Sequence, residues 1–256
     1  MNMMSNNILE LRNVCVSYSP GKYAVDNVSF SLERNTVTSI VGPRESGKSS
    51  LLRAINRMHE LYPNIKTKGE ILLNGKNIRE IDVRKIRRKI GMIFSQPNIF
   101  PNMSIKNNIL AGYRLNGIRL SKSKEDWVVE DILQRFGLWD DFKNLLDKKN
   151  VYLPEIHKQY LCMCRTLALN PELILMDAPL SSIKANLSIE KEELLADLKR
   201  NHTFLIIANR IPEAARISDY SIYMEDGKLI EYAPTRSLFT NPQEKQTIKY
   251  ITGIYE

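Results

Sequence analysis

The first forty residues alternate between hydrophobic and polar positions with the period of two that is typical of β-strands. The stretches LELRNVCVSY at 9–18 and AVDNVSFSLE at 24–33 show this alternation, and Pro20-Gly21 marks a turn between them. A shorter apolar run, TVTSIVG at 36–42, ends in a glycine. These patterns predict a chain that begins as a β-structure with antiparallel strands.

Helical periodicity follows the third strand. The stretch SSLLRAINRMHELY at 49–62 places Leu51, Leu52, Ile55 and Met58 on one face, which predicts a single helix. After it, the stretch GEILLNGKNI has the alternation of a hairpin, and its Asn-Gly pair favours a tight type I′ turn.

Strand signals largely stop between Pro97 and Asn170, where three helices are predicted at 104–115, 124–138 and 158–169. Strands and helices then alternate to the end of the chain, at 172–177, 190–200, 203–209, 212–218, 220–232 and 235–242. We therefore expect an α/β core with an N-terminal antiparallel β part and an inserted helical subdomain at 97–169. The whole chain, 1–256, is expected to be one domain.

The composition places few further limits on function. A net charge of +8 favours anionic partners such as nucleotides, nucleic acid or an acidic membrane surface, and it is equally compatible with a solvated basic surface. The densest basic cluster, RKIRRKI at 84–90, lacks the interleaved aromatic residues that are typical of proteins binding single-stranded nucleic acid.

The cysteines and the lengths of the hydrophobic runs indicate in which cellular compartment the chain lies. An odd number of cysteines, Cys15, Cys162 and Cys164, argues against a disulfide scaffold and for a reducing cytosol. Cys162 and Cys164 lie two apart on a predicted helix, which makes them a poor metal-binding pair. No apolar run approaches the ~20 residues of a membrane span, so membrane association is expected only through a partner.

The stretch GPRESGKSS at 42–50, called the phosphate loop here, matches the pattern G-x-x-x-x-G-K-[ST] between a strand and a helix. Its backbone N–H groups are expected to surround phosphate oxygens, with Lys48 reaching the terminal phosphates and Ser49 contacting Mg²⁺. The alternative is a glycine-rich turn with an exposed lysine. The expected nucleotide-binding residues are Gly42, Pro43, Arg44, Glu45, Ser46, Gly47, Lys48, Ser49 and Ser50.

Asp177 ends the apolar strand LILMD. An aspartate in this position is often only a turn or capping residue. Combined with the phosphate loop, it is the expected second metal-side oxygen, acting on Mg²⁺ directly or through a water molecule, alongside Ser49.

With these motifs the chain resembles the ATP-binding subunits of ABC transporters, most closely those of bacterial phosphate importers. The resemblance spans nearly the whole chain and is carried also by the segments 53–78, 87–109, 218–242 and 250–256. It implies a P-loop NTPase core of the ABC ATPase type with ATP and Mg²⁺ as cofactors. It also implies that Tyr18 stacks on adenine, although Tyr18 is also compatible with a plain strand tyrosine on a half-buried face.

The resemblance further implies partners. Two such subunits face each other head to tail and enclose two ATP molecules, and the second subunit is a copy of this chain or an ABC ATPase paralogue. Membrane-spanning permease subunits dock cytoplasmic helices near 97–113. The protein is then a peripheral subunit at the cytoplasmic face of the plasma (inner) membrane, and no nucleic acid is expected.

The sequence departs from the family pattern at the positions that carry hydrolysis. Ala178 stands at the catalytic glutamate and Asn209 at the switch histidine. The Q-loop glutamine position falls on Ser95, with Gln96 one residue later. Losing a positioned general base typically costs ~10²–10⁴-fold in rate.

Three further motifs are altered. The signature L-S-G-G-Q reads Leu-Pro-Glu-Ile-His at 153–157, called the signature segment here, and the D-loop reads Ser-Ser-Ile-Lys at 181–184. Proline lacks a backbone N–H group and glutamate carries the same charge as phosphate. Glu45 replaces a glycine inside the phosphate loop.

Three functions follow as hypotheses. The first is the ATP-binding subunit of a phosphate-type importer with weak hydrolysis, and the second is a catalytically dead pseudo-ATPase with a regulatory or structural role. The third, an ABC protein that handles nucleic acid, is disfavoured by the importer-like segments at both ends. The sequence leaves open whether the chain is an active ATPase, which solute is transported and whether the dimer is homo- or heteromeric.

Overall fold

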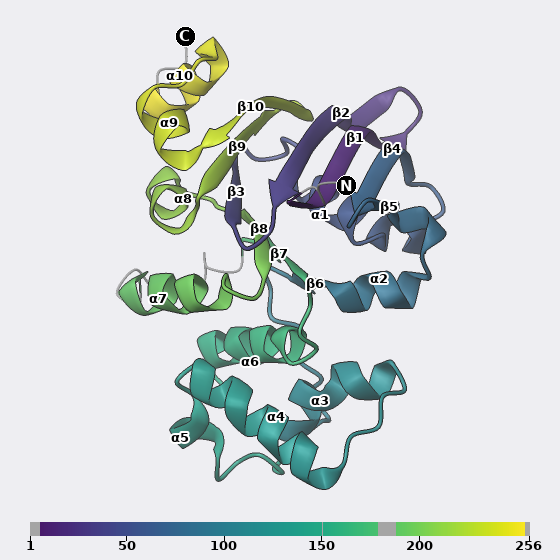
Figure 1. Ribbon diagram of the computed structural model, residues 1–256, viewed down its shortest axis with the longest axis vertical. Coiled ribbons are helices and arrows are strands. Elements are labelled where there is room, and N and C mark those ends of the chain that lie inside the picture. The colour runs from purple at the N-terminus through teal and green to yellow at the C-terminus, as the bar shows by residue number, and fades with distance from the viewer. Residues whose placement is uncertain (1–5, 150, 179–187, 254–256) are drawn as a thin grey trace, which may run out of the picture.

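A computed structural model describes residues 6–149, 151–178 and 188–253. Two β-sheets enclose the helix α1 (Lys48–Ile55), and a layer of helices lies beyond the second sheet (Figure 1). The predicted α/β class, with an N-terminal antiparallel part and a helical part, is confirmed.

The first sheet contains the N-terminal strands in the order β2-β1-β4-β5. All its pairs are antiparallel, and its members are β1 (Asn7–Ser19), β2 (Lys22–Glu33), β4 (Lys66–Leu73) and β5 (Lys76–Asn77). The predicted hairpin turn is present at Asn74 and Gly75, where both φ angles are positive as a type I′ turn requires.

The second sheet has the order β10-β9-β3-β8-β7-β6 and is parallel except for β10. Its strands are β3 (Val37–Val41), β6 (Ile90–Ile93), β7 (Leu173–Asp177), β8 (Thr203–Ile207), β9 (Tyr220–Glu225) and β10 (Lys228–Pro234). Every residue of β3, β7 and β8 is buried, as expected for parallel strands covered on both faces.

The two faces of this sheet belong to two hydrophobic cores. In β7, Leu173 and Leu175 pack with α1 and the first sheet, whereas Ile174 and Met176 pack with the helical layer. The alternation follows from the two-residue period of a strand. The second sheet therefore separates the core around α1 from the core of the helical layer.

The helical layer follows β6 in the chain. It contains α3 (Ile105–Leu115), α4 (Lys122–Arg135), α5 (Trp139–Phe142) and α6 (Glu155–Leu167). The three predicted helices are present, but α4 begins two residues earlier than predicted because Ser121 caps it, accepting a hydrogen bond from the Lys124 N–H. The limits 97–169 for a helical subdomain stay a prediction.

The helix predicted at 49–62 was wrong in its second half. The helix α1 ends at Ile55, Arg57 adopts a left-handed φ of 54°, and a 3₁₀ turn, η1, covers Met58–Leu61. The periodic pattern did not reveal the break, because the contacts that stabilise it are distant in sequence. The Arg57 guanidinium donates hydrogen bonds to two carbonyl groups of another segment, and these bonds stabilise the end of the helix at this point.

The remaining elements are helices and a 3₁₀ turn between and after the strands of the two sheets. They are η2 (Ile78–Glu80), α2 (Val83–Lys89), α7 (Ser188–Leu198), α8 (Ile211–Ile217), α9 (Thr235–Thr240) and α10 (Lys245–Thr252). The short helix α2 was not predicted from the sequence, and Asp82 is its N-cap. None of the helices that the structure describes combines the length and the apolar character needed to cross a bilayer.

Candidate nucleotide-binding site

The carboxyl ends of the central parallel strands meet at one edge of the second sheet. Ile207 in β8 lies beside Ile40 in β3 on one side and beside Asp177 in β7 on the other. This register brings the start of the phosphate loop and Asp177 to the same edge. Such an edge is where open α/β sheets bind ligands.

Two glycines let the phosphate loop lie against neighbouring backbone. A Cβ atom on Gly42, at φ +148°, would sit 2.0 Å from the Met224 carbonyl oxygen. A Cβ atom on Gly47, at φ +91°, would sit 2.0 Å from the Ala24 carbonyl oxygen. Neither position tolerates a side chain without movement of the backbone.

The N-terminus of α1 is open toward the loop. Gly47 is its N-cap, so no side chain accepts a hydrogen bond from the first N–H groups, and the first turn has no acidic residue. These donors and the helix dipole favour an anion.

Lys48 folds back over the loop. Its Nζ atom donates to the Gly42 carbonyl oxygen at 2.9 Å, to the Pro43 carbonyl oxygen and to Ser46 Oγ at 2.9 Å. Burial lowers the Lys48 pKa to about 8, although the Asp177 carboxylate acts in the opposite direction. The ammonium group thus lies where phosphate oxygens could replace neutral acceptors.

Ser49 and Asp177 form the expected oxygen pair. Ser49 Oγ donates to Asp177 Oδ1 at 2.8 Å, and Asp177 is buried. The second carboxylate oxygen, Oδ2, lies 3.9 Å from an Arg53 guanidinium nitrogen, a neighbour that the sequence analysis did not single out. A hydroxyl and a carboxylate beside a phosphate loop fit Mg²⁺, which binds few protein oxygens together with substrate phosphates.

Tyr18 reaches the same region from the end of β1. Its hydroxyl lies 3.0 Å from Ser50 Oγ at the start of α1, and its side chain remains 42% exposed. The hydroxyl also lies 3.3 Å from Nε2 of His59, a residue that showed no motif in the sequence. Tyr18 is therefore fixed at its hydroxyl end and open to solvent along the ring.

Comparison with known proteins gives the family. The sequence model of the ABC transporter family matches residues 25–181. The chain belongs to the ABC transporter family. The expected resemblance to ABC ATP-binding subunits, and to those of phosphate importers, is confirmed.

Three relatives of this ABC protein are named phosphate import ATP-binding protein PstB. The relative from Tropheryma whipplei is 37% identical over 96% of this chain and 98% of its own length. Those from Bifidobacterium longum and Rubrobacter xylanophilus are 39% and 40% identical over 90% of this chain, covering 92% and 83% of their lengths. These names lend no support to the alternative of a catalytically dead regulatory subunit.

A solved structure shares the fold. It is described as cbiO1 from Clostridium perfringens, part of the ABC transporter complex cbiONQ, and it aligns with a TM-score of 0.79 over 98% of this chain and 100% of its own. At 22% identity this likeness concerns the fold alone.

The positions at which the family resemblance predicts hydrolytic residues follow β6, β7 and β8 at the same sheet edge. Ala178 follows Asp177 directly and has a left-handed φ of 49°, with a partly buried methyl group against the core. Asn209 is exposed and lies two residues after β8. Ser95, which is half-buried, and Gln96, which is exposed, lie two and three residues after β6. Within the described part of this ABC protein, the side chains of Asn209, Ser95 and Gln96 form no hydrogen bond.

Glu45 adopts the left-handed conformation that the family's glycine would accept without strain, with φ 62°. Its side chain and that of Arg44 are both exposed, and among the described residues no ion pair joins them. No direct contact between these two side chains therefore offsets the Glu45 charge.

The signature segment is engaged in contacts within its own chain. Pro154 is the N-cap of α6 without a side-chain cap, and Glu155 in the first turn pairs with Lys158 at 2.8 Å. His157 lies 3.8 Å from Asp141 and packs its ring against Phe142. Glu155 thus places a negative charge at the helix end where a phosphate would otherwise be favoured. The D-loop positions 181–184 lie outside the described residues.

The Lys48 environment predicts that ATP binding takes up a proton at mildly alkaline pH. Its folded-state pKa of about 8 lies below the ordinary lysine value, and phosphate charge favours the ammonium form. At about pH 8.5, calorimetric binding enthalpies of MgATP should differ between two buffers of different ionisation enthalpy, reporting uptake of a large fraction of one proton.

At about pH 7 this uptake should nearly vanish, because Lys48 is already charged. Lys48→Arg is the matched control, since arginine keeps a cation that does not titrate. Binding enthalpies that are independent of the buffer at both pH values would contradict the prediction.

Proposed function

We propose that this ABC protein is the ATP-binding subunit of an importer of the phosphate-uptake type and that its own ATP hydrolysis is slow. The names of relatives with 37–40% identity support the importer type. The observation that carries nucleotide binding is the Ser49–Asp177 oxygen pair, with a 2.8 Å separation, beside the glycine-bounded phosphate loop.

Each group has a defined task in the bound state. Lys48 exchanges its carbonyl partners for oxygens of the terminal phosphates, and the open N–H groups of α1 donate to the phosphates. Ser49 and Asp177 would hold Mg²⁺, and the ion would neutralise phosphate charge. Tyr18 offers its exposed ring to the adenine base.

Slow hydrolysis follows from the substituted positions. The Ala178 methyl group cannot accept a proton from water, and Asn209 has no titratable ring to replace the family's histidine. The second subunit of the dimer also matters for hydrolysis, because in this family each nucleotide site is formed by two chains. A second copy would present its altered signature segment, whereas an ABC ATPase paralogue would present an intact one.

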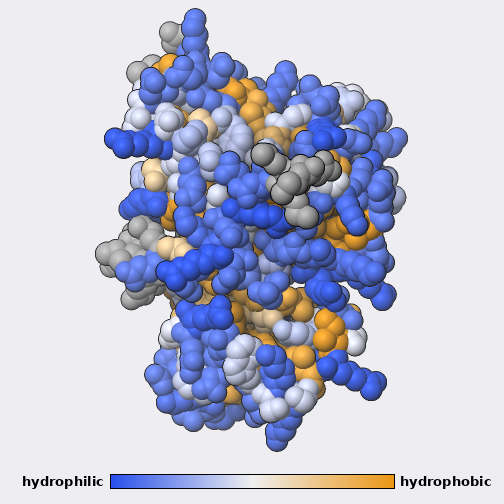
Figure 2. Space-filling model, in the orientation of Figure 1, coloured by the Kyte–Doolittle hydropathy of each residue, from blue (hydrophilic) through white to orange (hydrophobic). Residues whose placement is uncertain are grey.

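A cavity beside β6, lined also by residues of α2, α3 and α6, is the proposed docking site for a permease helix. It has a volume of about 300 Å³ and is lined by apolar residues, including Phe100 and Leu115, together with Arg87, Arg88 and Arg165. The buried Asn56 Oδ1 atom at its wall has no hydrogen-bond partner in the described structure. Figure 2 shows hydrophobic surface at the lower right, over the region of α3.

The occupant that suits this lining is a helix with an apolar face and an acidic side chain. Arg87 and Arg165 already bind backbone carbonyl groups, whereas Arg88 is exposed and forms no ion pair among the described residues. Docking here would hold the protein at the cytoplasmic face of the plasma membrane as a peripheral subunit. Charge complementarity of this kind mainly sets orientation and association rate.

Binding of ATP with Mg²⁺ is expected to be weak and to tighten when the Glu45 charge is removed. Calorimetry on the purified chain should give binding that becomes roughly two- to fivefold tighter in both Glu45→Gly and Glu45→Gln. Only Glu45→Gly should also raise stability, by about 1–2 kcal/mol, because glycine relieves the left-handed backbone. Absence of binding heat at millimolar ATP with folded protein would defeat the proposal.

Hydrolysis by the isolated chain is expected to lie close to that of Lys48→Ala. Phosphate release should differ by less than about threefold between the two proteins, because Ala178 leaves the attacking water without a base. Ala178→Glu alone should recover less than about tenfold, since the signature segment and Asn209 remain altered. A rate far above the Lys48→Ala control would show that another group substitutes, and Gln96 and Glu155 would be the first to mutate.

Reversing the free charge at the docking cavity should release the chain from native membranes. Arg88→Glu is expected to lower the membrane-bound fraction in sedimentation several-fold, because it repels an acidic side chain on the docking helix. Arg84→Glu is the matched control, as Arg84 is exposed on the same helix but does not line the cavity. Equal loss in both variants would point to a general charge effect and contradict this docking site.

A further inference from the structure

The hydroxyl of Tyr18 is held at two points. Ser50 Oγ lies 3.0 Å away and His59 Nε2 lies 3.3 Å away. A phenolic hydroxyl can donate one hydrogen bond and accept another, so both partners can be satisfied together. The imidazole also meets the Tyr18 ring edge to face, with ring centroids 5.7 Å apart and planes at 78°. These contacts fix the direction of the ring, while the Tyr18 residue remains 42% exposed.

His59 is itself buried and uncharged. Its exposed fraction is 3%, and its other ring nitrogen, Nδ1, lies 3.5 Å from Thr67 Oγ1 in β4. Burial, followed by the charge of Arg53, lowers the His59 pKa to about 4. At neutral pH the ring is therefore a neutral hydrogen-bonding partner with neighbours on both nitrogens.

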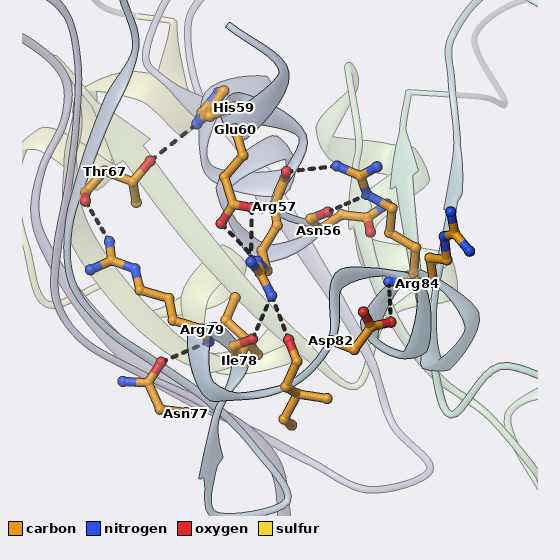
Figure 3. A network of polar contacts seen from close by, with 12 residues as sticks. Asn56, Arg57, His59, Glu60, Thr67, Asn77, Ile78, Arg79, Asp82 and Arg84 are labelled. Atoms are coloured by element: carbon orange, nitrogen blue, oxygen red, sulfur yellow. Dashed lines mark hydrogen bonds and ion pairs between the residues drawn. The ribbon is translucent and has the colours of Figure 1, made fainter. Parts of the chain in front are cut away.

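The backbone around His59 is fixed by a network of arginine contacts, which Figure 3 shows. Arg57 binds the carboxylate of Glu60 and donates to the carbonyl groups of Ile78 and Ile81. Arg87 from α2 donates to the Arg57 carbonyl oxygen at 2.9 Å. The turn η1, which carries His59, is thus held between α1, η2 and α2.

Without this turn, His59 would not lie beneath Tyr18. A helix continued through 49–62 would carry His59 further along the α1 axis, whereas the left-handed Arg57 ends the helix and redirects the chain. The break that the sequence pattern did not predict is therefore the feature that brings His59 to the edge of the candidate nucleotide site.

We propose that His59 is a positioning residue that holds the Tyr18 ring in the orientation needed to stack on the nucleotide base. The proposal rests on the base contact proposed above for Tyr18. It assigns His59 no contact with ATP, because its bonded neighbours are the Tyr18 hydroxyl and Thr67. Removing the imidazole frees the ring to rotate, so base recognition weakens while phosphate recognition remains.

The experiment compares two ligands, MgATP and magnesium tripolyphosphate, which lacks the base and ribose. Calorimetry or thermal-shift titration should show that wild type binds MgATP more tightly. Tyr18→Ala should weaken MgATP binding about tenfold, as expected for loss of one base–aromatic stack, and His59→Leu about three- to tenfold. Neither change should alter tripolyphosphate affinity. His59→Gln, which can still reach the Tyr18 hydroxyl, should restore most of the lost MgATP affinity.

His202→Leu is the matched control for losing a buried imidazole. His202 is 4% exposed, bonds the Pro171 carbonyl oxygen and packs on Phe204, with no contact to Tyr18. It should leave the ratio of the two affinities unchanged, and folding of each variant is checked by circular dichroism.

The outcomes separate the two proposals. If Tyr18→Ala weakens MgATP binding and His59→Leu does not, the positioning role is overturned and the base contact stands. If His59→Leu weakens both ligands equally, the residue only supports the fold and the inference is likewise overturned. If Tyr18→Ala itself leaves MgATP affinity unchanged, the base contact proposed for Tyr18 is contradicted together with the role of His59.

Discussion

The phosphate loop passes between carbonyl oxygens of the two sheets, and at its two closest approaches only glycine fits. Gly47 approaches Ala24 in β2, and Gly42 approaches Met224 in β9. A further backbone hydrogen bond of 2.8 Å, from Asp26 N–H to the Gly227 carbonyl oxygen, joins the sheets nearby. These close approaches set where α1 begins, and the start of α1 sets where Lys48, Ser49 and Ser50 point. The placement of the candidate site thus depends on a steric constraint more than on any polar contact.

The proposed function separates nucleotide binding from hydrolysis. The groups suited to holding a nucleotide are fixed by hydrogen bonds, Lys48 to a carbonyl group of the phosphate loop and Ser49 to Asp177 in β7. Where the family resemblance predicts a catalytic glutamate and a switch histidine, this chain carries Ala178 and Asn209. The Ala178 backbone adopts a left-handed conformation that a β-carbon disfavours. The proposal of slow hydrolysis thus combines the fold of the family with different side chains at the positions predicted to be catalytic.

Much of the fold could be predicted because the relevant patterns are local. Period-two alternation located the strands of the first sheet, and the Asn74-Gly75 turn followed from its conformational preference. The break after α1 could not be predicted, because it is stabilised by hydrogen bonds from Arg57 to carbonyl groups twenty or more positions away in the chain. The α2 helix was missed since its seven residues are too short for periodicity to stand out.

The candidate site divides in the same way. The loop motif and Asp177 are visible in sequence because a fixed spacing encodes them. Arg53 and His59 carry no motif, and they become neighbours of Asp177 and Tyr18 only through the packing of α1 and the turn after it. Long-range contacts of this kind leave no periodic trace in a single sequence.

The turn after α1 has one more consequence, which is thermodynamic. Asn56 and Met58 line the cavity beside β6, and the next residue, His59, touches the Tyr18 hydroxyl. The two faces of one short turn therefore belong to two separate surfaces. With the roles proposed above for the cavity and for His59, an occupant of the cavity that shifts this turn would alter the affinity for the nucleotide base. Linkage would then require the base to alter the affinity for that occupant by the same factor. Reciprocity between the two surfaces would then need no moving domain, only a displaced turn of four residues.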